Sequence, residues 1–208
     1  MSDNRGVSGP AWITDFTANA AETFVTAYYA ASDSPQRCQL LPTLYLPASS
    51  ISWNGNPISG AAQYAQLLDE QPGSQHEIQS FDCHPLGPWG AQDTHEPPSL
   101  LLTVSGTVSH YTPEFVAQKP ATNAPKTAGS SSAGKRKFDV DAPIGTLPLV
   151  FSQSFVLVNG AGTDAEGGVP FVWSQSRGAS KGKSTSAEAG TKTVAKYFIQ
   201  ADSFRFVG

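Results

Sequence analysis

Acid–base chemistry is the first function to weigh, because histidines and aspartates are spread along the whole chain. The histidines are His76, His84, His95 and His110. A catalytic histidine works beside a carboxylate or a nucleophile, but the sequence spaces none of the four as metal ligands or within a recognisable carboxylate motif. Aspartates that could act as general bases in a pocket are Asp82, Asp139, Asp141 and Asp202. No pattern pairs them, so we expect surface or loop positions for the histidines and surface or capping roles for the aspartates.

Signatures of nucleotide, nucleophile and metal sites are missing from the sequence. It has no Gly-rich phosphate loop, no Walker sequence and no GxSxG motif. Its two cysteines, Cys38 and Cys83, form no CxxC pair and lie in apolar or strand-like segments. Two reduced, buried thiols are therefore expected, with a disulfide between them as the alternative. We expect no catalytic residue, no cofactor and no metal.

A short basic run, Lys135-Arg136-Lys137, lies in a polar stretch rich in Gly, Ser and Pro. Such a run can be a nuclear-import signal or a phosphate contact. Three charges are a weak motif, so a solvated loop is the favoured interpretation. The net charge of −4 also argues against a broad nucleic-acid surface, because nucleic-acid-binding domains are normally basic.

The most informative pattern about function is the predicted strand from Lys196 to Val207. With period two, Phe198, Gln200, Asp202, Phe204 and Phe206 share one face, and Tyr197, Ile199, Ala201, Ser203 and Arg205 share the other. Both faces carry apolar side chains, so both need cover. Arg205 needs a partner if its face is covered. The face of Tyr197, Ile199 and Arg205 is therefore a candidate surface for a second protein.

Gln153 is the polar residue of a second apolar face. In the segment Phe151–Leu157 it alternates onto the same face as Phe151, Phe155 and Leu157. A buried amide must find hydrogen-bond partners, so Gln153 lies either at a partly wet interface or inside a hydrogen-bonded core. The interface is the favoured interpretation.

The elements that would position these residues are helices first and strands later. A helix is predicted from Thr14 to about Ser32, a short second one opens at Ser34-Pro35, and a third follows Ser59. Pro42 should kink or stop the second helix. A short strand, 50–53, precedes a predicted hairpin turn at Asn54-Gly55. The remaining strands are predicted at 75–84, 100–110, 148–159 and 194–207, an order typical of the α+β class.

Two polar stretches interrupt this series of strands, at about 112–147 and 160–193. We predict a single domain over residues 1–208, with these stretches as flexible insertions. Within the second stretch, the apolar island Val169–Trp173 either extends a strand or docks against the body, and both remain open. The first residues lack the flank and apolar run of a signal peptide, and no apolar run reaches the roughly 20 residues that span a bilayer. An intracellular protein is expected.

Four segments in this order resemble a known family: Trp53–Gly60, His76–Pro85, Phe151–Phe155 and Asp202–Phe206. Together they resemble the nuclear transport factor 2-like family, and within it the small subunits of heterodimeric mRNA export receptors, the p15-type and fungal mRNA transport regulators. The resemblance implies a cone-like α+β fold with three helices packed on a strongly bent antiparallel sheet. It also implies that the exposed sheet face pairs with a homologous domain of the large subunit.

The resemblance assigns roles to particular residues. Arg205 takes the place of an arginine that, in animal members, forms a salt bridge to an acidic residue of the large subunit. Gln153, Tyr197 and Ile199 are expected on or beside the same surface. Phe204 and Phe206 should face inward.

The function implied is a non-enzymatic subunit that helps to carry mRNA through the nuclear pore, shuttling between nucleus and cytoplasm. Its partners would be the large subunit, Phe-Gly-repeat nucleoporins through the complex, and mRNA indirectly or weakly. One alternative is a small-molecule dehydratase or isomerase of the same fold. The other is a homodimeric import carrier for the GDP-bound nuclear transport GTPase.

Overall fold

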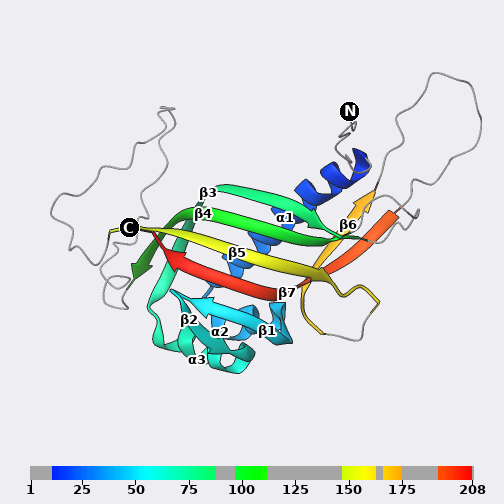
Figure 1. The fold of residues 1–208 in the computed structure, drawn as a ribbon. Coiled ribbons are helices and arrows are strands. Elements are labelled where there is room, and N and C mark those ends of the chain that lie inside the picture. The colour runs from blue at the N-terminus through cyan, green and yellow to red at the C-terminus, as the bar shows by residue number, and fades with distance from the viewer. Residues whose placement is uncertain (1–10, 88–96, 112–146, 163–165, 175–191, 208) are drawn as a thin grey trace, which may run out of the picture.

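The computed structural model describes residues 11–87, 97–111, 147–162, 166–174 and 192–207 (Figure 1). Within these ranges, helices lie against one face of a strongly bent seven-stranded sheet. The predicted α+β class is therefore confirmed. Most of the two predicted insertions, including Lys135, Arg136 and Lys137, lies outside the described residues.

The helices follow the predicted series. α1 spans Ala11–Ser32, α2 spans Arg37–Leu40, a 3₁₀ turn η1 covers Leu41–Leu44, and α3 spans Gly60–Glu70. Pro42 lies in the 3₁₀ turn, so α2 ends before it, as expected for a residue that cannot donate to the preceding turn. None of the helices among the described residues combines the length and apolar character needed to cross a membrane.

The sheet is built from seven strands that confirm all of the predicted ones. Their bounds are β1 Tyr45–Trp53, β2 Asn56–Ser59, β3 Gly73–Leu86, β4 Ser99–Tyr111, β5 Leu149–Asn159, β6 Val169–Ser174 and β7 Lys192–Phe206. The order is β2-β1-β7-β5-β4-β3, and β6 pairs with β7 beside β1. β1 and β7 run parallel whereas the other pairs are antiparallel, so the sheet is mixed rather than purely antiparallel.

Two local features follow directly from residue chemistry. Asn54 and Gly55 both have positive φ, 49° and 81°, in the turn between β1 and β2, which is the hairpin geometry their types favour. The apolar island left open by the sequence is strand β6. Its Phe171 and Trp173 pack against Phe16 of α1, with ring centroids 5.2 and 5.9 Å apart.

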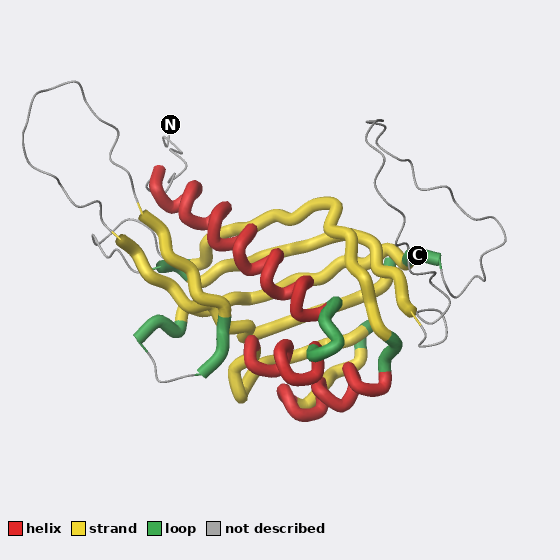
Figure 2. Tube along the Cα trace, turned by 180° about the vertical axis from the view of Figure 1, so that it is seen from behind, coloured by secondary structure: helices red, strands yellow, loops and turns green. Residues whose placement is uncertain are grey.

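The core lies between α1 and the concave face of the sheet. Figure 2 shows α1 crossing the strands on that side, with α2 and α3 beside the β1 end of the sheet. Phe16, Phe24 and Tyr28 of α1 are buried against Phe155 and other inward side chains of the strands. The opposite face of the sheet, turned toward the viewer in Figure 1, carries none of the helices formed by the described residues.

Candidate partner-binding surface

The helix-free face of the sheet is the candidate surface for a partner, and we call it the outer face. In β4, β5 and β7, buried side chains alternate with more exposed ones, because successive side chains of a strand point to opposite faces. The more exposed set on the three strands is Leu101, Thr103, Ser105, Val150, Ser152, Ser154, Val156, Ala201, Ser203 and Arg205. On these three strands, aliphatic and small hydroxyl side chains thus share the outer face with one arginine.

Arg205 lies where the sequence places it, exposed on the outer face near the end of β7. Its register partner on β5 is Ser152. Within the described part of the chain the guanidinium makes no ion pair or hydrogen bond. It can therefore pair with an acidic residue of another protein. The proposed pairing with an acidic partner residue remains a prediction.

Tyr197 and Ile199 do not share that face, and the expectation that their side chains line the interface is wrong. In the β5–β7 register, Val156 is opposite Ala201 but Leu157 is opposite Ile199, which leaves Gln200 as an extra residue. Such a β-bulge reverses the alternation beyond it. Tyr197 and Ile199 are therefore buried in the core, 1% and 0% exposed, and the Tyr197 hydroxyl donates to the Pro98 carbonyl over 2.8 Å.

The three phenylalanines of β7 are buried or half-buried, and each is covered by different neighbours. Phe204 faces inward as predicted, stacked on Trp53 at 4.2 Å, and Phe206 is half-buried beside it, with ring centroids 5.1 Å apart. Phe198 is buried away from the main core cluster, beneath Gly168. Its burial comes from a connecting segment rather than from the helices.

Gln153 belongs to the core, so its expected place at an interface is wrong. Its side chain is 1% exposed. Its Nε2 donates to Asp202 Oδ1 and to the Tyr28 hydroxyl, both over 2.9 Å, and its Oε1 accepts from the Tyr29 hydroxyl over 2.9 Å. The alternative of a hydrogen-bonded amide inside the core is the one that the structure has.

Asp202 is a buried carboxylate rather than a surface or capping residue, and its expected role is wrong. It is 4% exposed, and Tyr45 donates to its Oδ2 over 2.6 Å. Burial raises the pKa of Asp202 from 3.8 to about 6, while hydrogen bonds from Tyr45, Gln153 and Tyr28 act in the opposite direction. Tyr28 also lies 3.3 Å from the Tyr45 hydroxyl and 3.2 Å from the Tyr64 hydroxyl. A polar network therefore crosses the core from α1 to β7.

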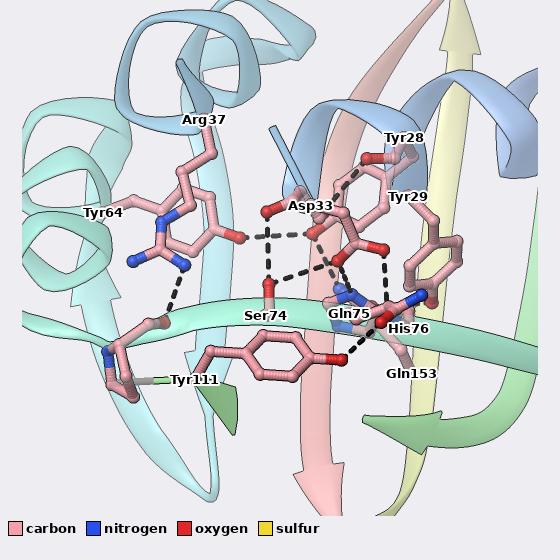
Figure 3. A network of polar contacts seen from close by, with 12 residues as sticks. Tyr28, Tyr29, Asp33, Arg37, Tyr64, Ser74, Gln75, His76, Tyr111 and Gln153 are labelled. Atoms are coloured by element: carbon pink, nitrogen blue, oxygen red, sulfur yellow. Dashed lines mark hydrogen bonds and ion pairs between the residues drawn. The ribbon is translucent and has the colours of Figure 1, made fainter. Parts of the chain in front are cut away.

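His76 is the histidine that the structure pairs with a carboxylate (Figure 3). Its Nδ1 is 2.6 Å from Asp33 Oδ1, and its backbone N–H donates to Asp33 Oδ2 over 2.8 Å. Ser74 Oγ donates to the same carboxylate. The ring packs on Tyr29, with centroids 5.0 Å apart. The prediction of a surface position is wrong for His76, whose contacts join the end of α1 to β3.

Two spaces adjoin this network, an open hollow of about 1,030 Å³ beside Asp33, Arg37 and Tyr111 and a small cavity beside His76. A cavity of about 40 Å³ is lined by side chains that include Tyr64, His76, His110 and Gln153. A water molecule occupies roughly 30 Å³ in the liquid, whereas ligand pockets run from roughly 300 to 1,000 Å³. The aromatic side chains of Tyr28 and Phe204 fill the adjoining interior. The small cavity suits a structural water better than a substrate.

The two cysteines form neither a disulfide nor a metal site in the part of the chain that the structure describes. Cys38 and Cys83 are both free and half-buried rather than fully buried. Burial raises the pKa of the Cys83 thiol to about 12, so it stays protonated at neutral pH. No three His, Cys, Asp or Glu residues in the described ranges are grouped to hold a metal ion.

The outer-face residues of β4 and β5 were missed at the sequence level although a signal was present. In 100–104, buried Leu100, Leu102 and Val104 alternate with Leu101 and Thr103, which is the two-sided pattern of a strand with one face on a core. The same alternation therefore adds Leu101 and Thr103 to the face that carries Arg205.

Comparison with known proteins supports the resemblance read from the motifs. Residues 16–93 match a family model described as "Nuclear pore RNA shuttling protein Mtr2". The bovine (Bos taurus) NTF2-related export protein 2 is 35% identical over 94 residues, which cover 45% of this chain and 63% of the relative. The chain thus matches a little under two thirds of that relative's length. The resemblance to nuclear transport factor 2-like export proteins is confirmed by these two matches.

Solved structures support the fold. A chain in the structure of the Chaetomium thermophilum Mex67 NTF2-like domain complexed with Mtr2 superposes with a TM-score of 0.52 at 18% identity, covering 92% of this chain and 98% of that one. A putative scytalone dehydratase from Novosphingobium aromaticivorans reaches 0.50 at 10% identity, covering 96% and 89%. At such identities the likeness shows the fold alone, and this fold includes an enzyme among its neighbours.

Proposed function

We propose that this chain, whose residues 16–93 match the Mtr2 family model, is the small, non-enzymatic subunit of a heterodimeric nuclear mRNA export receptor. Its partner would be the NTF2-like domain of a Mex67-type large subunit, since a chain of the same fold occurs in a complex of that domain with Mtr2. The pair would contact Phe-Gly-repeat nucleoporins and mRNA, the latter indirectly, while shuttling between nucleus, pore and cytoplasm.

The observation that carries this proposal is the outer face itself. Among the described residues it is a sheet surface that no helix covers, and it presents Leu101, Val156 and Arg205, whose guanidinium has no partner in that part of the chain. A stable heterodimer would bury upwards of about 1,500 Å² on such a surface, with apolar residues at its centre. An Arg205–carboxylate pair at that interface would fix register and partner choice more than it would add affinity.

The enzymatic alternative has two observations in its favour, the half-buried pair of His76 and Asp33 and a putative dehydratase among the structural neighbours. The cavity of about 40 Å³ beside His76 is too small for a substrate. His76 and Asp33 therefore support the fold in this proposal. A homodimeric carrier is less favoured, because a chain of the same fold occurs in a heteromeric complex, that of the Mex67 NTF2-like domain with Mtr2.

The test of the proposal is the substitution Arg205→Asp. Because Arg205 is exposed and its side chain makes no ion pair or hydrogen bond with the described part of the chain, the variant should fold like the wild type. Against the purified NTF2-like domain of the large subunit, its affinity should fall by a factor of about 30 or more, as expected when an interfacial charge is reversed. Affinity is measured by calorimetry and complex formation by size-exclusion chromatography.

Lys192→Asp is the matched control, since Lys192 is also an exposed cation on β7, at the opposite end of the strand. It makes the same change in net charge and should leave binding within a factor of about three, the scale of a distant surface charge. If Arg205→Asp bound the large-subunit domain as tightly as Lys192→Asp does, the proposed interface would be wrong.

A further inference from the structure

We propose that a hollow in the outer face, over Ala201 of β7, receives a large aromatic side chain of the partner. This inference rests on the proposed function and deepens it, because it assigns the centre of the interface to a feature other than Arg205. The hollow has a volume of about 450 Å³ and lies over β1, β7 and β5. In the part of the chain that the structure describes, no side chain fills it.

The hollow exists because small side chains meet large ones on neighbouring strands. Ala201 is opposite Ser50 on β1 and opposite Val156 on β5. Two residues further along β7, Ser203 is opposite Ser52. The methyl and hydroxymethyl side chains of β1 and β7 leave a low area, and the longer side chains of Val156 and its neighbour Leu101 on β4 form a wall beside it.

The lining chemistry indicates the type of side chain that fits. One side is aliphatic, from Leu101 and Val156, and the other side carries the hydroxyl groups of Ser50, Ser52 and Ser203. No hydrogen bond within the described chain uses these three hydroxyls. A tyrosine or tryptophan combines an apolar body with a polar tip, so it would pack on the aliphatic wall and hydrogen-bond to the serine side. Aromatic residues are also the usual anchors at interface centres.

The position of the hollow ties it to the proposed interface. Ala201, Ser203 and Arg205 alternate along the same face of β7. At roughly 3.3 Å per residue, Arg205 lies about 13 Å along the strand from Ala201. One partner domain can therefore reach both, with its aromatic side chain in the hollow and an acidic residue beside Arg205. The apolar contact would supply affinity, and the charge pair would set the orientation.

The test is Ala201→Phe, which fills the hollow from within. Ala201 is half-buried and faces outward, so the new ring leaves the core untouched, and aromatic residues suit strands. The variant should lose at least tenfold in affinity for the purified NTF2-like domain of the large subunit, with an unchanged melting temperature. Val194→Phe is the control, because Val194 is exposed on the same strand, outside the hollow, and should bind within about threefold of wild type.

Two further arms keep the outcomes distinct. If Ala201→Phe does not fold, Ser52→Phe fills the same hollow from β1 and is judged by the same criterion. A folded filling variant that binds normally, while Arg205→Asp does not bind, overturns the aromatic anchor and leaves the proposed function standing. If Arg205→Asp itself binds normally, the proposed interface is wrong, and if wild type does not bind the large-subunit domain, the proposed function fails. An isolated wild-type dimer that Ala201→Phe dissociates would place a second copy in the hollow and overturn the inference.

Discussion

At the scale of single residues, the unusual choice in this chain is a carboxylate inside the core. Asp202 is surrounded by the hydroxyl of Tyr45, the amide of Gln153 and the nearby Tyr28. No lysine or arginine among the described residues pairs with it. Hydrogen bonds alone offset only part of the free-energy cost of burying a charge. The raised pKa, about 6, is the direct expression of that remaining cost.

This raised pKa predicts that acid stabilises the fold over a defined range. Between the ordinary value of 3.8 and the folded value of about 6, the folded state holds a proton that the unfolded state has lost. The free energy of unfolding should therefore fall as pH rises through this range, by up to about 3 kcal/mol, and then level off. Urea unfolding from pH 4 to 7.5 measures this dependence.

Asp202→Asn is the variant that isolates the effect, because the amide keeps the shape of the carboxyl group without its titration. The difference in unfolding free energy between variant and wild type should change in favour of the variant as pH rises from 4 to 6. Other titrating groups cancel in this difference. A difference that is independent of pH would show that Asp202 does not titrate as its burial predicts.

At the scale of elements, the sequence predicted most of the fold through periodicity, and periodicity also explains its error. Alternation located the long strands and the inward face of Phe204 correctly. One extra residue, Gln200, forms a β-bulge that reverses the alternation in β7. Neither Gln200 nor its neighbours are of a residue type that predicts a bulge. Tyr197 and Ile199 were assigned to the wrong face for this reason. The parallel pairing of β1 with β7 was missed too, because strands about 150 residues apart in sequence leave no local signal.

The segment before β6 shows a second element-scale feature, which carries a prediction. Gly168 has φ +71°, donates its N–H to the Thr43 carbonyl over 3.0 Å, and lies so close that an added Cβ would be 2.9 Å from the Phe198 ring. Gly168→Ala should therefore both strain the backbone and push Phe198 from its buried position. We expect a loss of about 2–4 kcal/mol in unfolding free energy, measured in urea.

Gly162→Ala is the matched control for this loss. Gly162 also has positive φ, +85°, but an added Cβ would meet nothing within 4 Å. It should cost only the backbone strain, about 1 kcal/mol. Equal losses in the two variants would mean that close packing of the Gly168 segment on Phe198 contributes nothing to stability.

At the scale of the whole molecule, the two faces of the sheet have different roles. The concave face is closed by α1 and carries the aromatic core and the Asp202 network. On β4, β5 and β7 the outer face carries serines, threonines, a few aliphatic side chains and Arg205, a composition that tolerates water yet can pack against another protein. A sheet with its concave face buried in the core and its outer face exposed to solvent fits a subunit that binds a partner domain.

If the outer face is that interface, the partner should stabilise the whole fold by mass action. A ligand that binds only the folded state at 100 times its Kd adds about 2.7 kcal/mol, which corresponds to a rise of roughly 5–10 °C in Tm for a domain of this size. Wild type and Lys192→Asp should both show this rise when the large-subunit domain is added, whereas Arg205→Asp, with its affinity reduced about 30-fold or more, should show no more than about a third of it. Differential scanning calorimetry with the partner in excess measures all three. An equal rise in Tm for Arg205→Asp would show that the partner binds elsewhere than on the outer face, because its stabilising effect would then not depend on Arg205.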